Sequence, residues 1–170
     1  TMTGEFTRRQ FLARTGSIMA CSSAMATIAN RFEVAASEPS RVWKAGVAKA
    51  VITPQTSVWL AGYGSKRAPD GKLHDLWMKA LALEDDAGRR AVLITSDFQG
   101  VPKGMSDRVF EQLKMRFQLD RSQVMLTFSH NHCGPRLGDD LVDYYPVEAE
   151  QVALVEAYTA LMVTKCVEMV

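Results

Sequence analysis

The sequence has little net charge, few cysteines and no hydrophobic run long enough to cross a membrane. Its 20 Lys and Arg residues nearly balance its 19 Asp and Glu residues, and a formal net charge of +1 gives no electrostatic reason to expect a nucleic acid or an anionic membrane as a partner. Of the three cysteines, Cys21 lies near the N-terminus; Cys133 and Cys166 could pair, but two cysteines do not make a disulfide framework, so we expect these two to be reduced or simply buried. The apolar stretch 18–29 is shorter than the roughly 20 residues that span a bilayer, so no stable transmembrane segment is expected.

The first part of the chain has the pattern of an export signal. Thr7–Gly16 contains paired arginines followed by Phe-Leu, as in twin-arginine signals, and the weakly apolar stretch 18–29 follows it. We therefore predict that residues 1–36 are a signal peptide and that the mature protein is exported to the periplasm or outside the cell. An alternative is lipidation at Cys21, because Ile18–Cys21 resembles a weak lipoprotein cleavage box.

The remaining residues, 37–170, predict one α/β domain. The composition, 47% hydrophobic and 23% charged, is that of a globular chain. Apolar runs rich in β-branched residues predict strands. Those at 90–95 and 124–128 are expected to be buried, the first of them on both faces. Apolar residues at helical spacing predict helices. The expected strands cover residues 45–53, 76–84, 90–95 and 124–128, with a short helix as the alternative for 76–84, and the expected helices cover 105–117 and 148–170.

The strand at 90–95, the helix at 105–117 and the strand at 124–128 form a βαβ unit, which makes the two strands parallel. The sheet should therefore be mostly parallel or mixed. Asp97 follows the first of these strands, and His130 and His132 follow the second, just before a Gly-Pro turn. If the strands are neighbours, about 5 Å apart, the carboxylate and the imidazoles line one crevice at the edge where α/β proteins bind ligands.

Two imidazoles at such a position suit a metal ligand and a proton-transfer group, but they also suit a pair of structural histidines. A metal site needs three or four ligands, more than these residues supply with any diagnostic pattern. His74, next to Asp75, is either part of an orienting pair or a surface residue. Cys133, beside His132, raises the weaker hypothesis of a cysteine nucleophile.

Five segments, taken together and in order, resemble the neutral/alkaline ceramidase family. They comprise an opening strand, a Gly-Tyr-Gly loop containing Gly62 and Gly64, a histidine followed by a strand, a strand-end aspartate, and a variant of the family's His-Thr-His-Ser-Gly-Pro signature. In this chain they are Ala45–Pro54, Ala61–Gly64, His74–Leu83, Thr95–Asp97 and Ser129–Pro135.

The resemblance implies a zinc-dependent amidohydrolase that cleaves the N-acyl amide bond of ceramide or a related small-molecule or lipid amide. His130 would be a zinc ligand, and His132 would lie beside the metal and assist the reaction. Asp97, His74 and the glycines at 62 and 64 would lie in or around the pocket. Zinc would polarise the amide carbonyl and activate the nucleophile.

The chain also departs from the family. Asn131, Cys133 and Arg136 stand where the family has Thr, Ser and Gly. The family's other zinc ligands and its serine nucleophile lie further along a much longer domain, so we expect this chain to be the N-terminal portion of a larger hydrolase domain, incomplete without the missing C-terminal part. The competing hypothesis is a non-catalytic exported domain whose histidines bind a structural metal or none.

Overall fold

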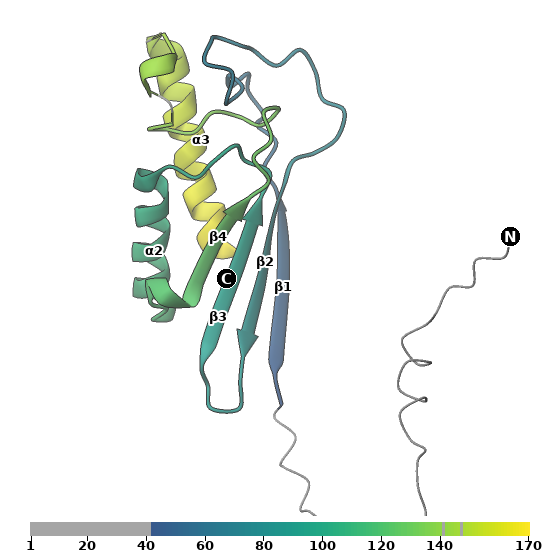
Figure 1. The fold of residues 1–170 in the computed structure, drawn as a ribbon, viewed down its shortest axis with the longest axis vertical. Coiled ribbons are helices and arrows are strands. Elements are labelled where there is room, and N and C mark those ends of the chain that lie inside the picture. Colours follow the sequence, from purple (N-terminus) through teal and green to yellow (C-terminus); the bar gives the residue numbers. More distant parts are fainter. Residues whose placement is uncertain (1–41, 141, 147) are drawn as a thin grey trace, which may run out of the picture. The chain divides into compact units, whose positions relative to one another are not determined.

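The computed structural model describes residues 42–140, 142–146 and 148–170, and it shows a four-stranded mixed sheet with helices (Figure 1). The sheet order is β1-β2-β3-β4, with antiparallel pairing from β1 to β3 and parallel pairing between β3 and β4. The predicted α/β class and the parallel βαβ pair are therefore confirmed. The expected signal peptide and Cys21 lie outside the described residues. The elements are β1 Lys44–Val51, β2 Trp77–Glu84, β3 Arg90–Ser96, α2 Lys103–Phe117, η1 Arg121–Gln123, β4 Val124–Phe128, η2 Val142–Tyr144 and α3 Ala149–Glu168.

The element boundaries agree with the sequence pattern to within about two residues. Helix α2 begins two residues earlier than the apolar spacing predicted, because its first turn starts at the Pro102 carbonyl, which accepts from the Ser106 N–H at 3.0 Å. It ends at Gln118, whose φ of 58° is left-handed and stops the helix. Among the described residues, neither helix combines the length and the hydropathy needed to cross a membrane.

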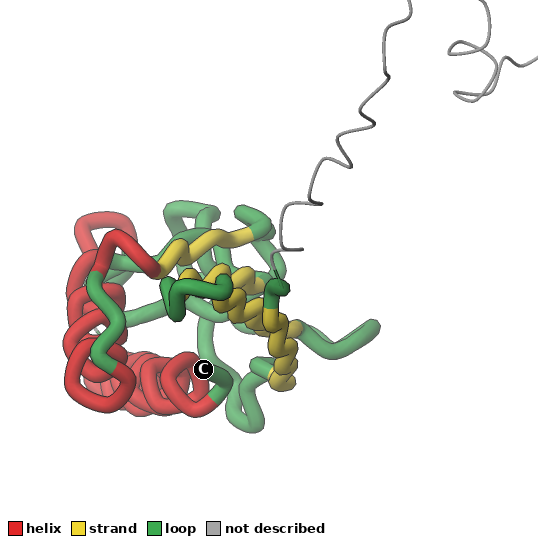
Figure 2. Tube along the Cα trace, turned by 90° about the horizontal axis from the view of Figure 1, so that it is seen from below, coloured by secondary structure: helices red, strands yellow, loops and turns green. Residues whose placement is uncertain are grey.

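Both helices cover the same face of the sheet (Figures 1 and 2). Strand residues that face the helices alternate along each strand, such as Val92 and Ile94 in β3, and are buried against apolar side chains of α2 and α3. Phe98, just past β3, is 0% exposed and belongs to the same core. The core therefore extends to the segment that leaves β3, where Asp97 lies.

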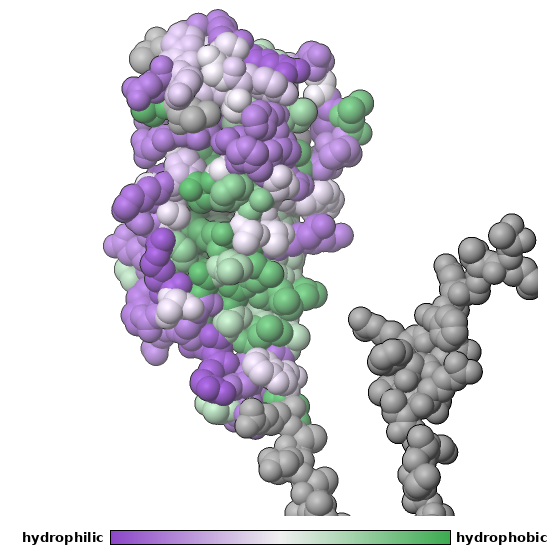
Figure 3. All heavy atoms as spheres, viewed as in Figure 1, coloured by the Kyte–Doolittle hydropathy of each residue, from purple (hydrophilic) through white to green (hydrophobic). Residues whose placement is uncertain are grey.

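The opposite face of the sheet is open, which corrects the prediction that β3 is buried on both faces and that β4 is a buried strand. Val47, Leu81, Leu93 and Met125 form one row across the four strands by their register. Val47 is 83% exposed and Met125 62% exposed. Figure 3 shows hydrophobic residues gathered over the strands on this side. The error arose because an apolar run shows that both faces of a strand are hydrophobic, not that both are covered.

The hairpin between β2 and β3 makes stability depend on pH. Asp85 accepts hydrogen bonds from the backbone N–H groups of Arg89 and Ala87, at 2.8 and 3.1 Å, and pairs with the Arg89 side chain at 2.6 Å. The backbone and side-chain hydrogen bonds from Arg89 are the main cause that lowers the pKa of Asp85. A lowered folded-state pKa stabilises the fold above the unfolded pKa, near pH 4, and this contribution disappears as the pH falls through the folded value.

We therefore expect Asp85→Asn to lower the melting temperature at pH 7 and to flatten its decline below about pH 4, where the wild-type carboxylate becomes protonated. Melting curves of both proteins between pH 2 and 7 would test this. Parallel curves for the two proteins would show that Asp85 contributes no such pH dependence.

Candidate functional site

The carboxyl ends of β3 and β4 meet at one edge of the sheet, as the βαβ pattern predicted. Ser96 pairs with Phe128 in the parallel ladder, and the Ser129 N–H donates to the Ser96 carbonyl at 3.0 Å, which continues the pairing by one residue. Asp97 and the residues after Phe128 therefore begin side by side. We call Ser129–Pro135 the histidine turn.

The glycine-rich loop is fixed against the histidine turn by the backbone. The Ala61 N–H donates to the Gly134 carbonyl at 3.0 Å, and Leu60 forms an antiparallel bridge with Pro135. The hydroxyl of buried Tyr145 donates to the Leu60 carbonyl at 3.1 Å and accepts from the Gly62 N–H at 3.0 Å. These bonds bring two segments about 70 residues apart in the chain into one site.

His130 is held in an unusual conformation with one ring nitrogen engaged. Its φ is 56°, in the left-handed region that costs a non-glycine residue roughly 1–2 kcal/mol. Its Nδ1 lies 2.7 Å from the Gln99 carbonyl oxygen. Since a carbonyl oxygen only accepts hydrogen bonds, Nδ1 is the nitrogen that donates, and the other ring nitrogen, Nε2, is the one that can face a ligand. Strain of this kind concentrates at functional sites.

His132 lies between His130 and the glycine-rich loop. The Nε2 atoms of the two histidines are 3.5 Å apart, and the edge of the Tyr63 ring packs against His132 with centroids 5.3 Å apart. A Cβ atom built on Gly62 would lie 2.6 Å from Nδ1 of His132, closer than any real contact. The absence of a side chain at Gly62, which also has a φ of 89°, therefore makes room for the imidazole.

The two ring nitrogens fit part of a zinc site. Two nitrogen ligands of a tetrahedral zinc, each about 2.1 Å from the metal, lie about 3.4 Å apart, close to the distance between the two Nε2 atoms. A ligand histidine whose other nitrogen donates to a backbone carbonyl, as His130 does to Gln99, is a common arrangement around metals. Among the described residues, no group of three or more His, Cys, Asp or Glu side chains could hold a metal ion. The chain therefore offers two nitrogens and not a complete set.

Asp97 reaches this edge, but its carboxylate has another partner. Oδ2 of Asp97 accepts a hydrogen bond from the Trp77 N–H at 2.8 Å, which ties the end of β3 to the start of β2. Its backbone carbonyl faces the histidine turn instead and accepts from Asn131 at 2.8 Å.

Gly64 has a φ of 63°, and a Cβ there would make only an ordinary contact, 3.5 Å from Tyr144.

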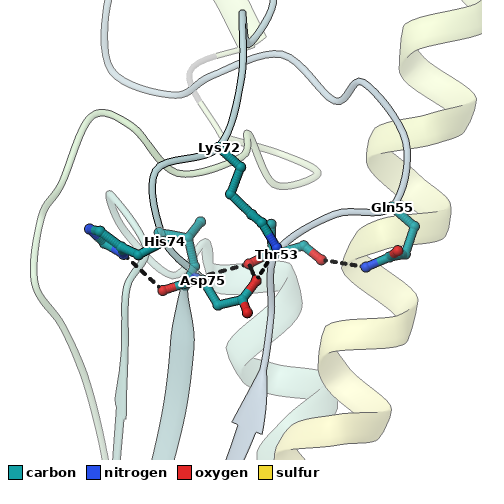
Figure 4. Close-up of polar contacts among 6 residues, drawn as sticks. Thr53, Gln55, Lys72, His74 and Asp75 are labelled. Carbon is teal, nitrogen blue, oxygen red and sulfur yellow. Dashed lines mark hydrogen bonds and ion pairs between the residues drawn. The ribbon is translucent and has the colours of Figure 1, made fainter.

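His74 lies in an exposed loop with its own hydrogen bonds (Figure 4). Its Nδ1 is 3.0 Å from the backbone oxygen of Asp75, so of the two alternatives for His74 the orienting pair of side chains is not formed. The Asp75 carboxylate accepts instead from Lys72 and from the Thr53 hydroxyl, both at 2.9 Å, and these bonds lower the pKa of Asp75. The surface interpretation of His74 therefore fits the structure better.

The two described cysteines are free thiols, as the sequence predicted. Cys166 is buried in the core, and burial raises the pKa of its thiol to about 12, which keeps it protonated and inert. Cys133 is exposed, and its backbone N–H takes part in the histidine turn by donating to Asn131.

Gln99 and Tyr63 were not predicted as site residues. Gln99 acts through a backbone carbonyl, which every residue has, so no sequence signal could have identified it. Tyr63 lies in the Gly-Tyr-Gly loop, where the family resemblance points to the glycines and not to the tyrosine.

Two solved structures share the fold of this chain. One is neutral ceramidase from Pseudomonas aeruginosa, 24% identical with a TM-score of 0.59, and the other is a ceramidase complexed with C2, 27% identical with a TM-score of 0.58. Each match covers 75% of this chain and 20% of the neighbour, so the chain spans about a fifth of the length of these proteins. No family model and no curated protein sequence matches the chain.

Proposed function

We propose that this chain is part of a ceramidase-like hydrolase and that the histidine turn contributes to its zinc site. The observation that carries the proposal is the pair of imidazoles at the sheet edge, with the two Nε2 atoms 3.5 Å apart and the His130 proton held on Nδ1 by Gln99. The likeness of the fold to two ceramidases supports the reaction class.

In this proposal His130 binds zinc through Nε2, and His132 lies beside the metal, presents its own Nε2 to the ion and assists the reaction from that position. Bound zinc would polarise the carbonyl of the scissile amide and activate the nucleophile. Gly62 leaves space for the His132 ring, and Tyr63 packs against it, so both residues orient the imidazole. The substrate would be ceramide or a related amide with an N-acyl chain, which hydrolysis separates into an acid and an amine.

The remaining ligands and the nucleophile would come from polypeptide outside the described residues. Two histidine nitrogens do not saturate a zinc ion, which takes three or four protein ligands. The open apolar face of the sheet supports this part of the proposal, because sheets with such apolar strands are normally covered on both faces.

We also propose that the protein is exported by the twin-arginine pathway. Mass spectrometry of secreted protein tests cleavage of the signal, and secreted material that still begins before residue 30 would contradict it.

The zinc site is tested by elemental analysis of purified protein. We expect the wild type to retain zinc and His130→Ala to lose it, because the variant lacks the nitrogen fixed by Gln99. His74→Ala is the matched control, since His74 is an exposed histidine whose ring nitrogen lies against the Asp75 backbone oxygen and not against the histidine turn. In a longer chain that includes the missing ligands, His130→Ala should also abolish amide hydrolysis.

Zinc at equal levels in wild type and His130→Ala would overturn the proposed ligand. Absence of zinc from both the chain and the longer protein would favour the alternative, an exported domain without catalytic activity. The observation that favours this alternative is the same 3.5 Å separation, which also suits a weak hydrogen bond from His132 to His130. Unchanged hydrolysis by the longer protein in a chelator would likewise exclude the zinc mechanism.

A further inference from the structure

Asn131 stands between the two histidines and bonds to the backbone on both sides of the turn. Its Nδ2 donates to the Asp97 carbonyl at 2.8 Å, and its Oδ1 accepts from the Cys133 N–H at 2.9 Å. A longer contact of 3.4 Å joins Nδ2 to the Ser129 hydroxyl. The side chain is half-buried, so these bonds are partly protected from water.

These bonds join the histidine turn to the segment that leaves β3. Asp97 anchors the Asn131 side chain, and Gln99, two residues later, anchors the His130 ring. The packing here is close, because a Cβ atom on Gly134 would lie 2.9 Å from the Asp97 carbonyl oxygen and 3.5 Å from Asn131. One short segment thus fixes both the backbone after His130 and the ring of His130.

The left-handed conformation of His130 needs such support. A non-glycine residue keeps a positive φ only where its surroundings compensate for the strain. The bond from Asn131 to Asp97 acts on the residue directly after His130, and the bond from Cys133 to Asn131 acts on the residue directly after His132. The Asn131 amide therefore constrains the backbone directly after each of the two histidines.

We propose that Asn131 is a positioning residue, whose side-chain amide holds His130 and His132 with their Nε2 atoms directed at a common ligand. The inference rests on the proposed zinc function, but it concerns the geometry of the two rings, which also exists without metal. Asparagine suits this role because its side chain has a donor and an acceptor at once. Serine would keep an acceptor for the Cys133 N–H but is too short to reach Asp97.

The chain contains a matched control at the other end of the same two strands. Gln123 uses its side-chain amide in the same way, with Nε2 donating to the Arg90 carbonyl at 2.8 Å and Oε1 accepting from the Asp120 N–H at 2.9 Å. Arg90 begins β3, and Gln123 directly precedes β4. Removing this amide should weaken the pairing of β3 with β4 without changing the positions of the two histidine rings.

The experiment compares Asn131→Ala, Asn131→Ser and Gln123→Ala with the wild type. Titration calorimetry with ZnCl₂ is expected to show a loss of affinity of about 10-fold or more for both Asn131 variants, the effect typical of removing a residue that orients a metal ligand. Gln123→Ala should bind zinc as the wild type does. Cobalt absorption spectra should change in the Asn131 variants only.

Metal-free protein gives a second readout. Nitrogen-15 NMR of the histidine rings should show the wild-type His130 protonated at Nδ1, as the Gln99 contact requires, and a loss of this tautomer preference in Asn131→Ala. Absence of zinc from both this chain and the longer protein would contradict the proposed function, and the ring spectra would then decide the positioning role by themselves. Three results would each overturn the positioning role of Asn131. They are ring spectra of Asn131→Ala that match the wild type, zinc affinity of Asn131→Ser that matches the wild type, and a loss of zinc affinity in Gln123→Ala as large as in the Asn131 variants.

Discussion

Gly62→Ala is expected to displace the His132 imidazole and to weaken zinc binding by about 10-fold or more. The new Cβ would lie within 2.6 to 2.8 Å of three atoms of the His132 ring, so the ring or the loop must move. Neither moves freely, because Tyr145 holds the Gly62 N–H and Tyr63 packs against the ring. Alanine must also adopt a φ of 89°, which costs roughly 1–2 kcal/mol of stability in addition.

Gly64→Ala separates the effect of backbone strain from the effect of crowding the His132 ring. Gly64 has a φ of 63°, so alanine there carries a similar backbone strain, but its Cβ would meet only Tyr144 at an ordinary 3.5 Å. We expect both variants to lower the melting temperature and only Gly62→Ala to lower zinc affinity in titration calorimetry. Equal zinc affinity in the two variants would show that the space beside His132 does not matter for binding.

Phe98→Ala is expected to cause the largest loss of stability, about 3–5 kcal/mol. Phe98 is 0% exposed and packs in the core directly between Asp97 and Gln99, so the cavity would open under the segment that anchors the histidine turn. A loss of this size should lower the melting temperature by roughly 10 °C or more. Urea unfolding with linear extrapolation would measure it.

Phe128→Ala is the matched control, since it removes the same side chain at a position that is 46% exposed. Because much less apolar area leaves the interior, we expect no more than about half the loss found for Phe98→Ala. A free energy of unfolding that falls equally in both variants would mean that Phe98 does not occupy the core in solution.

The strands and helices were predictable because their signals are local. Alternation and apolar runs located β3 and β4, and the helical spacing between them required a parallel pair, which placed Asp97 and the histidines at one edge. The direction of the Asp97 carboxylate was not predictable, because it depends on the Trp77 N–H that the β2–β3 pairing brings near. The sequence carried no indication either that Gly62 contacts His132, about 70 residues later.

The residues of the candidate site thus differ in whether the sequence alone can identify them. Residue types that do chemistry, such as His130 and His132, were visible in the sequence as a motif. Groups that hold them depend on the folded backbone, as the carbonyls of Gln99 and Asp97 do, and backbone carbonyls have no residue-specific signature. Asn131 was visible only as a departure from a family pattern, and the two hydrogen bonds behind its proposed role depend on the fold.

The row formed by Val47, Leu81, Leu93 and Met125 has a consequence for how this chain behaves with fluorescent probes. Dyes such as ANS bind exposed apolar surface, and their uptake usually indicates a molten globule with loosened side-chain packing. Here the folded domain, as far as the structure describes it, already presents such a surface across four strands. ANS fluorescence from this protein would therefore be a property of its native state, and near-UV circular dichroism would be the appropriate criterion of intact packing.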